Sequence, residues 1–301
     1  TYDHILYDSV RGTGTGAMLS SNSTGVEGFD SAYANLTAYA SNGFTVGTTS
    51  GTNVLNNSGQ TFVAWQWQAG QGSTSSNTNG SITSTVSVNA TAGFSIVTYT
   101  GTGANATVGH GLGVAPSMVI VKARNQGTYN WNVYHGSLAA TQDLNLNGTA
   151  AAFTAADAWN STAPTSSVFS VGTRVETNGS GATMVAYCFS AVAGYSAFGS
   201  YTGNGSTDGP FVYCGFRPRF VMTKRIDTTG PWQIIDSSRD TYNSGINGLF
   251  PNTSGAEASF TQPNGIDFLS NGFKLRNSST DDNASGGTYI YAAFSEAAFR
   301  N

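Results

Sequence analysis

Residues 99–103 read YTGTG and residues 201–205 read YTGNG, an offset of 201 − 99 = 102 residues. Thirteen residues after the last glycine of each stretch comes a proline, Pro116 in APSMVIVK and Pro218 in RPRFVMTK, so the offset is kept. The lysines that end these stretches, Lys122 and Lys224, keep it as well. Because order and spacing agree, the pair indicates an internal repeat rather than a phosphate-binding loop.

The agreement continues over about a hundred residues. Trp131 in NWNVYH matches Trp232 in PWQIID, and Leu146-Asn147 matches a stretch that begins at Phe250. Both copies close on a similar strand, SGATMVAYCF at 180–189 and SGGTYIYAAF at 285–294. We therefore predict a second repeat at 93–193 and a third repeat at 194–301.

A first copy is present but incomplete. SSNSTGVE at 20–27 matches FPNTSGAE at 250–257, SNGFTV at 41–46 matches SNGFKL at 270–275, and SGQTFVAWQW at 58–67 matches the two closing strands. Residues 1–68 form this partial first repeat, in which nothing supplies the YTGxG half. We expect the chain to be a fragment of a longer polypeptide, or its first repeat to be completed by another chain.

The repeat reads as all-β. Runs such as MVIVK, FVMTK and TYIYAAF are rich in branched and aromatic residues and are bounded by Gly, Asn, Ser and Pro. Alternate positions of the closing strands, Val63/Trp65/Trp67, Val185/Tyr187/Phe189 and Ile290/Ala292/Phe294, share one face, which we expect to point inward. The predicted fold is a series of tandem β-sandwich domains of about 100 residues, jelly-roll or lectin-like.

Two segments depart from the strand pattern. Residues 69–92 are rich in Gly, Ser and Asn and are predicted to be a flexible linker, although SITSTVSV within them alternates like a strand. A turn of helix is expected near Ala151–Ala158.

Composition excludes several function classes. Only 9% of the residues are charged and the net charge is −4, which argues against a nucleic-acid footprint. No apolar run approaches the roughly 18 residues of a membrane-spanning helix, so membrane insertion is not expected. The two cysteines, Cys188 and Cys214, either pair or remain free thiols, and free thiols are favoured.

No catalytic or cofactor motif is recognisable. The glycine runs GTGTG at 12–16 and GHGLG at 109–113 lack the strand and helix context of a nucleotide site, and His4, His110 and His135 lack zinc-ligand spacing. Calcium would suit the acids of the third repeat, but no DxDxDG run is present and solvated loop acids are favoured. We predict no cofactor and no enzymatic activity.

Aromatic residues are the remaining binding candidates. Trp131 and Trp232 recur at the start of a strand, and Tyr129 and Tyr134 lie nearby, so exposed rings would offer a flat platform for glycans. Core packing is the alternative, and recurrence with the repeat favours it. Asp8/Arg11 and Asp236/Arg239 share a D-x-x-R spacing, which we expect to be an ion pair bracing a turn.

Several long strings, among them GHGLGVAPSMVIVK at 109–122, YSAFGSYTGNGSTDGPFVYCGFRPRFVMTKR at 195–225 and DFLSNGFKLR at 267–276, resemble a repeat family of marine tailed bacteriophages, cyanophages and their relatives among them. Members of that family look like large virion proteins of tail-fibre type, and no catalytic residue is carried over. The resemblance implies an extracellular virion protein, a surface fibre of tail or head that serves host attachment. It also implies partners among other virion proteins, a host surface glycan, and copies of the chain itself, with a trimer expected. A carbohydrate-binding module without a structural role is the alternative.

Overall fold

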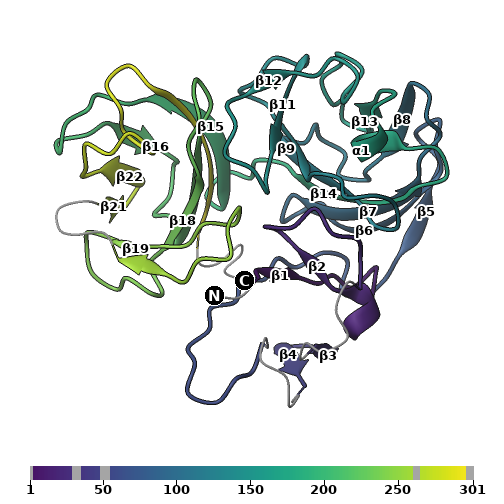
Figure 1. Cartoon of the computed structure of the whole chain (residues 1–301), viewed down its shortest axis with the longest axis horizontal. Helices are drawn as coiled ribbons and strands as arrows, with labels where there is room; N and C mark the ends of the chain where they lie inside the picture. The colour runs from purple at the N-terminus through teal and green to yellow at the C-terminus, as the bar shows by residue number, and fades with distance from the viewer. Residues whose placement is uncertain (1–2, 29–34, 48–54, 260–264, 296–301) are drawn as a thin grey trace.

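The computed structural model describes residues 3–28, 35–47, 55–259 and 265–295, and over these residues the chain is all-β with several sheets. Figure 1 shows three lobes around a common centre, coloured purple, teal and green to yellow in chain order. They correspond to the first, second and third repeats. Within the described residues the only helices are one 3-10 turn and one short α-helix, and none is long and apolar enough to cross a membrane.

The second repeat is built on an eight-stranded antiparallel sheet. A second layer formed by β8 (Ala106–Gly109), β13 (Val168–Val171) and α1 (Val175–Asn178) covers one face of this sheet, and an apolar core that includes Val121, Trp159 and Phe169 lies between the two layers. The sheet order is β12 (Phe153–Thr154), β11 (Gln142–Asn145), β10 (Asn132–His135), β9 (Met118–Ala123), β14 (Thr183–Phe189), β7 (Phe94–Thr100), β6 (Ser84–Asn89) and β5 (Ser75–Asn77).

Two sequence expectations are wrong in this region. The expected linker at 69–92 contains β5, which no pattern predicted, and β6, which lies largely within the strand-like SITSTVSV; both extend the sheet beside β7. Its serines do not prevent this, because Ser84 and Ser87 are buried and their hydroxyls bond the carbonyl of Gly109 and the amide of Gly70. The helical turn expected near Ala151–Ala158 is instead a short strand, β12, followed by hydrogen-bonded turns.

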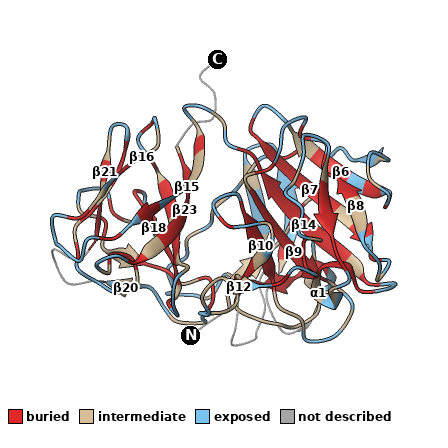
Figure 2. Ribbon diagram, turned by 90° about the horizontal axis from the view of Figure 1, so that it is seen from above, coloured by how far each residue is buried: buried red, intermediate tan, exposed pale blue. Residues whose placement is uncertain are grey.

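The third repeat has the same central arrangement. Its four-stranded sheet runs β15 (Ser196–Thr202), β23 (Thr288–Phe294), β17 (Phe220–Arg225), β18 (Trp232–Asp236), so β23 lies between β15 and β17 as β14 lies between β7 and β9. Figure 2 shows β14 and β23 buried in their lobes. The remaining strands are β16 (Phe211–Tyr213), β22 (Gly272–Leu275), β21 (Ile266–Leu269), β19 (Asn247–Gly248) and β20 (Ala258–Ser259).

The first repeat contains less regular structure. It has the pair β1 (Ile5–Leu6) and β2 (Leu19–Ser20), the 3-10 turn η1 (Thr15–Ala17), and the hairpin β3 (Leu36–Ala40) with β4 (Gly43–Val46). The closing strand predicted at 58–67 begins with a turn at 58–59, and the rest has no regular structure and is not part of any sheet. The two strands that flank its counterparts have no equivalent among the described residues of this repeat, so its backbone has nothing to pair with.

The YTGxG stretches are the opening turns of the second and third repeats, as the sequence predicts. The Tyr99 hydroxyl donates to the carbonyl of Thr177 at 2.5 Å, and the Tyr201 hydroxyl donates to the carbonyl of Asp282 at 2.8 Å. A buried asparagine then holds each turn, because the amide of Thr102 donates to Oδ1 of Asn178 at 2.8 Å. In the third repeat the amide of Asn204 donates to Oδ1 of Asn283 at 2.9 Å.

The glycines of the motif are required by space and by conformation. A Cβ atom on Gly101 would lie 2.2 Å from the carbonyl oxygen of Gly179, and one on Gly203 would lie 2.3 Å from that of Ala284. Gly103 and Gly205 adopt φ of 72° and 68°, the left-handed region that favours glycine. The motif is therefore a backbone requirement of the turn.

We predict that Gly101→Ala lowers the free energy of unfolding by about 2 kcal/mol, because the added methyl group meets main-chain atoms that cannot move aside. Urea denaturation followed by tryptophan fluorescence measures the loss. Gly136→Ala is the control, since the nearest atom to its Cβ is 3.5 Å away. Equal stability of the two variants would contradict the assigned role of Gly101.

Candidate functional site

Each closing strand has two apolar faces. On β14, Met184, Ala186 and Cys188 belong to the internal core of the second repeat, whereas Val185 and Tyr187 point out of it. On β23 the face with Tyr289 and Ala293 lines the internal core of the third repeat, and the face with Ile290 does not. The second face of each strand is buried between the repeats.

These second faces meet in one cluster, which we call the shared core. It takes residues from all three repeats, and Trp65 and Trp67 of the first repeat pack against it half-buried. The positions predicted to share an inward face therefore point into a core common to the repeats, with the exception of Val63, which does not pack against it. Its buried members are Leu19, Ala69, Phe94, Ile96, Met118, Ile120, Trp131, Val133, Leu138, Leu144, Leu146, Val185, Tyr187, Phe189, Phe220, Trp232, Ile234, Ile290, Ala292 and Phe294.

Three matching residues of the closing strands meet at the centre of the shared core. The ring centroids of Trp67 and Phe189 are 6.1 Å apart, those of Trp67 and Phe294 5.4 Å, and those of Phe189 and Phe294 5.8 Å. All three contacts are edge-on, the favourable geometry for aromatic pairs. We call this set the aromatic triangle. It brings the closing segments of the three repeats together at one place.

The predicted aromatic platform is not exposed. Trp131 is 0% exposed and Trp232 is 1% exposed, and each indole lies between two repeats. The Nε1 atom of Trp131 donates to the carbonyl of Ser20 at 2.9 Å, and that of Trp232 donates to the carbonyl of Asn145 at 2.9 Å. Each tryptophan therefore ties its repeat to the preceding one, and packing, the alternative reading, fits the burial.

The two tyrosines of the predicted platform lie elsewhere. Tyr134 is on the opposite face of β10 from Trp131, where it contacts Trp159 in the internal core of the second repeat. Tyr129 is half-buried, and its carbonyl accepts a hydrogen bond from Nζ of Lys122 at 2.5 Å. The structure does not bring the four predicted residues together on one surface.

The position of Trp131 and Trp232 is taken by His4 in the first repeat. The stretch TYDH at 1–4 corresponds to TYNW at 128–131. The imidazole of His4 lies against the main chain of Phe250 and Thr253 in the third repeat, and burial lowers its pKa. The first repeat thus contacts the third at the position where the third contacts the second, which closes a ring.

The repeat lysines make the same connection between neighbours. Nζ of Lys122 donates to the carbonyl of Thr24 in the first repeat at 2.9 Å. Nζ of Lys224 donates to the carbonyl of Thr149 in the second repeat at 3.3 Å. Burial lowers the pKa of both lysines to about 8, since the ammonium group loses hydration.

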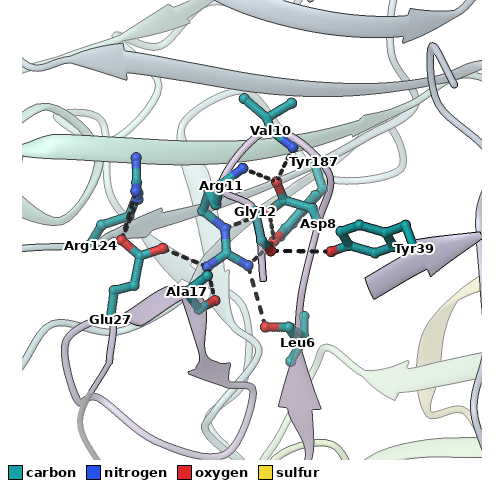
Figure 3. A network of polar contacts seen from close by, with 10 residues as sticks. All are labelled: Leu6, Asp8, Val10, Arg11, Gly12, Ala17, Glu27, Tyr39, Arg124 and Tyr187. Atoms are coloured by element: carbon teal, nitrogen blue, oxygen red, sulfur yellow. Dashed lines mark hydrogen bonds and ion pairs between the residues drawn. The ribbon is translucent and has the colours of Figure 1, made fainter. Parts of the chain in front are cut away.

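An ion-pair network, drawn in Figure 3, joins the first and second repeats. The side chain of Arg11 is fully buried and pairs with Asp8 at 2.5 Å and Glu27 at 2.7 Å. Glu27 also pairs with Arg124 of the second repeat at 2.7 Å, and the Tyr187 hydroxyl donates to Asp8 at 2.8 Å. Burial opposes the charge of Arg11, but its partners outweigh this and raise its pKa.

The predicted D-x-x-R ion pairs are confirmed. Asp236 pairs with Arg239 at 2.7 Å, and one carboxylate oxygen of each aspartate accepts the amides of the following turn. The other oxygen of Asp236 accepts Nε1 of Trp65 at 3.3 Å, so this joint connects the third repeat to the first. Glu257 repeats the role of Glu27 by pairing with Arg239 at 2.7 Å.

In the second repeat His135 takes the place of these aspartates. Its Nδ1 accepts the amide of Ser137 at 3.1 Å, as the aspartates accept their turn amides. The ring therefore carries its proton on Nε2, which donates to the carbonyl of Tyr291 in the third repeat at 3.2 Å. Burial lowers the pKa of His135 to about 4. Asp8 and His135 thus bond the closing strand of the next repeat, and Asp236 bonds the closing segment of the first repeat.

The side chains considered for metal binding have other partners. Within the described residues no three His, Cys, Asp or Glu side chains are placed to hold a metal ion. The acids considered for calcium have separate partners, for example Asp227 with Arg225 and Asp282 with Asn277. Cys188 and Cys214 are free thiols, as favoured from the sequence, and burial raises the pKa of both.

The sequence did not reveal the groups that cross from one repeat to another. Tyr187 and His135 occupy recurring positions of the repeat and Arg124 does not, but in each case the partner is 97 to 179 residues away and spacing does not identify it. Only the alternation of the closing strands carried a signal, because it marked an apolar face at Tyr187.

Residues 1–298 match a family described as a domain of unknown function, DUF7483. No curated protein and no solved structure is significantly similar to the chain.

We predict that Arg11→Met lowers the free energy of unfolding by about 3 kcal/mol, because Asp8 would keep a buried charge without its partner. Arg239→Met is the matched variant and should cost clearly less, since the side chain of Glu257 is 42% exposed against 13% for Glu27. Urea denaturation measures both, and equal losses would contradict the importance of the buried network.

We predict that His135 makes the protein less stable in acid. A histidine with a folded pKa of about 4 and an unfolded pKa near 6.5 contributes stability above pH 6.5, and this is lost as the pH falls towards 4. His135→Gln keeps the donor to Tyr291 without the titration. Between pH 7.5 and 4.5 the wild type should lose about 2 kcal/mol more than this variant. Parallel stability curves from urea titrations would refute the assignment.

Proposed function

The chain belongs to the DUF7483 family, and we propose that it is a structural protein of a bacteriophage virion, a tail-fibre or head-fibre segment that displays β domains towards the host. The observation that supports this proposal is the use of the motif residues: Trp131, Trp232 and the lysines of the repeat hold one repeat against the next. A chain whose recurring side chains serve assembly fits a building element better than an enzyme.

The proposal includes the finer architecture expected from the sequence. We take the second and third repeats as tandem β-sandwich domains of about 100 residues, of jelly-roll or lectin-like type. Two features support it: each repeat has two β layers, and each has an internal apolar core of its own between them.

The low charge suits an extracellular particle in salt water. Screening lengths there fall to a few ångströms, so surface ion pairs contribute little and burial must supply stability. The buried ion pairs and the shared core are interactions that burial protects from salt. We propose further that the chain assembles as a homo-oligomer, a trimer, beside other virion proteins.

Glycan binding is the second candidate function. One observation favours it, on the strand β16 and not at the tryptophans predicted from the sequence. On β16, Phe211 is 44% exposed and Tyr213 is 67% exposed, and they share the outer face because Val212 between them is buried. Lys274 and Asp208 form an ion pair beside this strand at 2.8 Å. Two neighbouring rings with a polar rim are a surface of the kind that sugars use.

Particle composition tests the structural role. Purified particles of the phage that encodes the chain should contain it in many copies by mass spectrometry, and gold-labelled antibodies should mark fibres on tail or head in electron micrographs. Absence of the chain from intact particles would refute the proposal.

A glycan-binding experiment distinguishes the second candidate function from a purely structural role. Wild type and Tyr213→Ala would be compared on a glycan array, with Tyr242→Ala as the control because Tyr242 is 86% exposed and lies outside β16. Binding that only Tyr213→Ala abolishes would support a glycan site on β16, and no binding by the wild type would leave the structural role alone.

A further inference from the structure

The closing segment of the first repeat has no regular structure and is unpaired. Between residues 61 and 69 no backbone hydrogen bond is formed with any other described residue. Its side chains nevertheless alternate as in a strand, with Val63, Trp65 and Trp67 half-buried and the residues between them exposed. The counterparts β14 and β23 have a partner on both edges.

The strand β1 has an open edge that faces the same space. β10 pairs with both β9 and β11, and β18 pairs with β17 and bridges to Leu249, whereas β1 pairs with β2 alone. A cavity of about 1740 Å³ is lined by both Ile5–Ser9 and Gln60–Ala69. We call this cavity the acceptor groove. Figure 1 draws this segment as a plain trace without the arrow of a strand.

The turn that precedes the closing segment already has the conformation of a complete repeat. Gly59 has φ of 77°, close to 71° at Gly181 and 74° at Gly286. The asparagine that holds the YTGxG turn in the other repeats, Asn178 or Asn283, is 0% exposed. Its counterpart Asn56 is exposed and bonds no other described residue.

The third repeat also presents an unused acceptor at the groove. In the two complete joints, the repeat lysines donate to the carbonyls of Thr24 and Thr149. The corresponding carbonyl, that of Ser254, accepts no hydrogen bond from the described residues, and the groove wall extends to Gly255–Glu257. A lysine that entered with a strand beside β1 would reach this carbonyl.

We propose that the acceptor groove binds a polypeptide segment with the pattern of the opening half of the repeat, added as β-strands to the edges of the closing segment and β1. The required pattern is a YTGxG turn followed by a strand with apolar residues at its first and third positions and lysine at its fifth. Met118, Ile120 and Lys122 show it in the second repeat, where the first two enter the shared core.

The same contacts argue against a second copy of the chain as the occupant. Residues 93–127 and 194–228 carry the required pattern, but their strands already pair inside their own repeats. Donation from a second copy would open one of those sheets. A further segment of this type adds backbone hydrogen bonds at two open edges and covers Trp65 and Trp67 without such a loss. This inference does not depend on the virion role.

A synthetic peptide of residues 93–127 added to the full chain tests the proposal. Calorimetry and native mass spectrometry should show one peptide per chain, and tryptophan emission should shift to shorter wavelength as Trp65 and Trp67 become covered. A peptide with Met118→Asp and Ile120→Asp should bind about a hundredfold more weakly, because it would place charges in the shared core.

The chain variant Asn56→Ala tests the other side of the same contact, where Asn56 would hold the YTGxG turn of the peptide. Asn56 is exposed and bonds no other described residue, so its loss should leave the stability of the free chain unchanged and weaken peptide binding about tenfold. No binding, or equal binding of both peptides by both chains, would overturn the proposal. So would a stable dimer of the chain that excludes the peptide, because the second copy would then be the occupant.

Discussion

The closing strands of this protein have apolar side chains on both faces, and this constraint decides how the repeats are arranged. One face of β14 and of β23 is covered by the second layer of its own repeat. The other face, which carries Phe189 or Phe294, is left for a neighbour. Three such faces meet at the aromatic triangle, where their rings contact edge-on. The repeats therefore pack in a ring rather than as a linear row of separate domains. Burial of apolar surface is thus the term that holds the ring together.

Polar groups buried by this arrangement form hydrogen bonds with the neighbouring repeat. A buried donor without a partner costs roughly 1–3 kcal/mol, so each indole or ammonium group taken into the ring needs an acceptor. The acceptors are main-chain carbonyls of the neighbouring repeat, such as those of Ser20, Thr24 and Asn145. Backbone carbonyls do not depend on side-chain identity, which explains how one joint geometry is kept while the sequence of the repeats diverges.

The sequence predicts what is local to a repeat. The YTGxG turn, the D-x-x-R ion pair and the shared face of the closing strands all follow from spacing and from the period of a strand. The ring does not, because alternation marks Tyr187 as apolar-facing without naming what covers it. The linker assignment at 69–92 was wrong for β5, since serine and asparagine are typical of linkers when their hydrogen-bond partners are unknown, whereas the alternation of SITSTVSV did indicate β6. The unpaired segment at 58–67 shows the converse: a strand pattern needs neighbours before it becomes a sheet.

The three contacts between neighbouring repeats share a geometry but differ in chemistry. This difference determines which repeat can lie next to which. Asp8 meets a tyrosine hydroxyl, Asp236 meets an indole, and His135 meets a carbonyl oxygen. Exchange of two repeats would set an aspartate against a carbonyl, two acceptors with no hydrogen between them. The chain therefore encodes not only three interlocking parts but also the sequence in which they interlock, which discourages misassembly among modules that otherwise look alike.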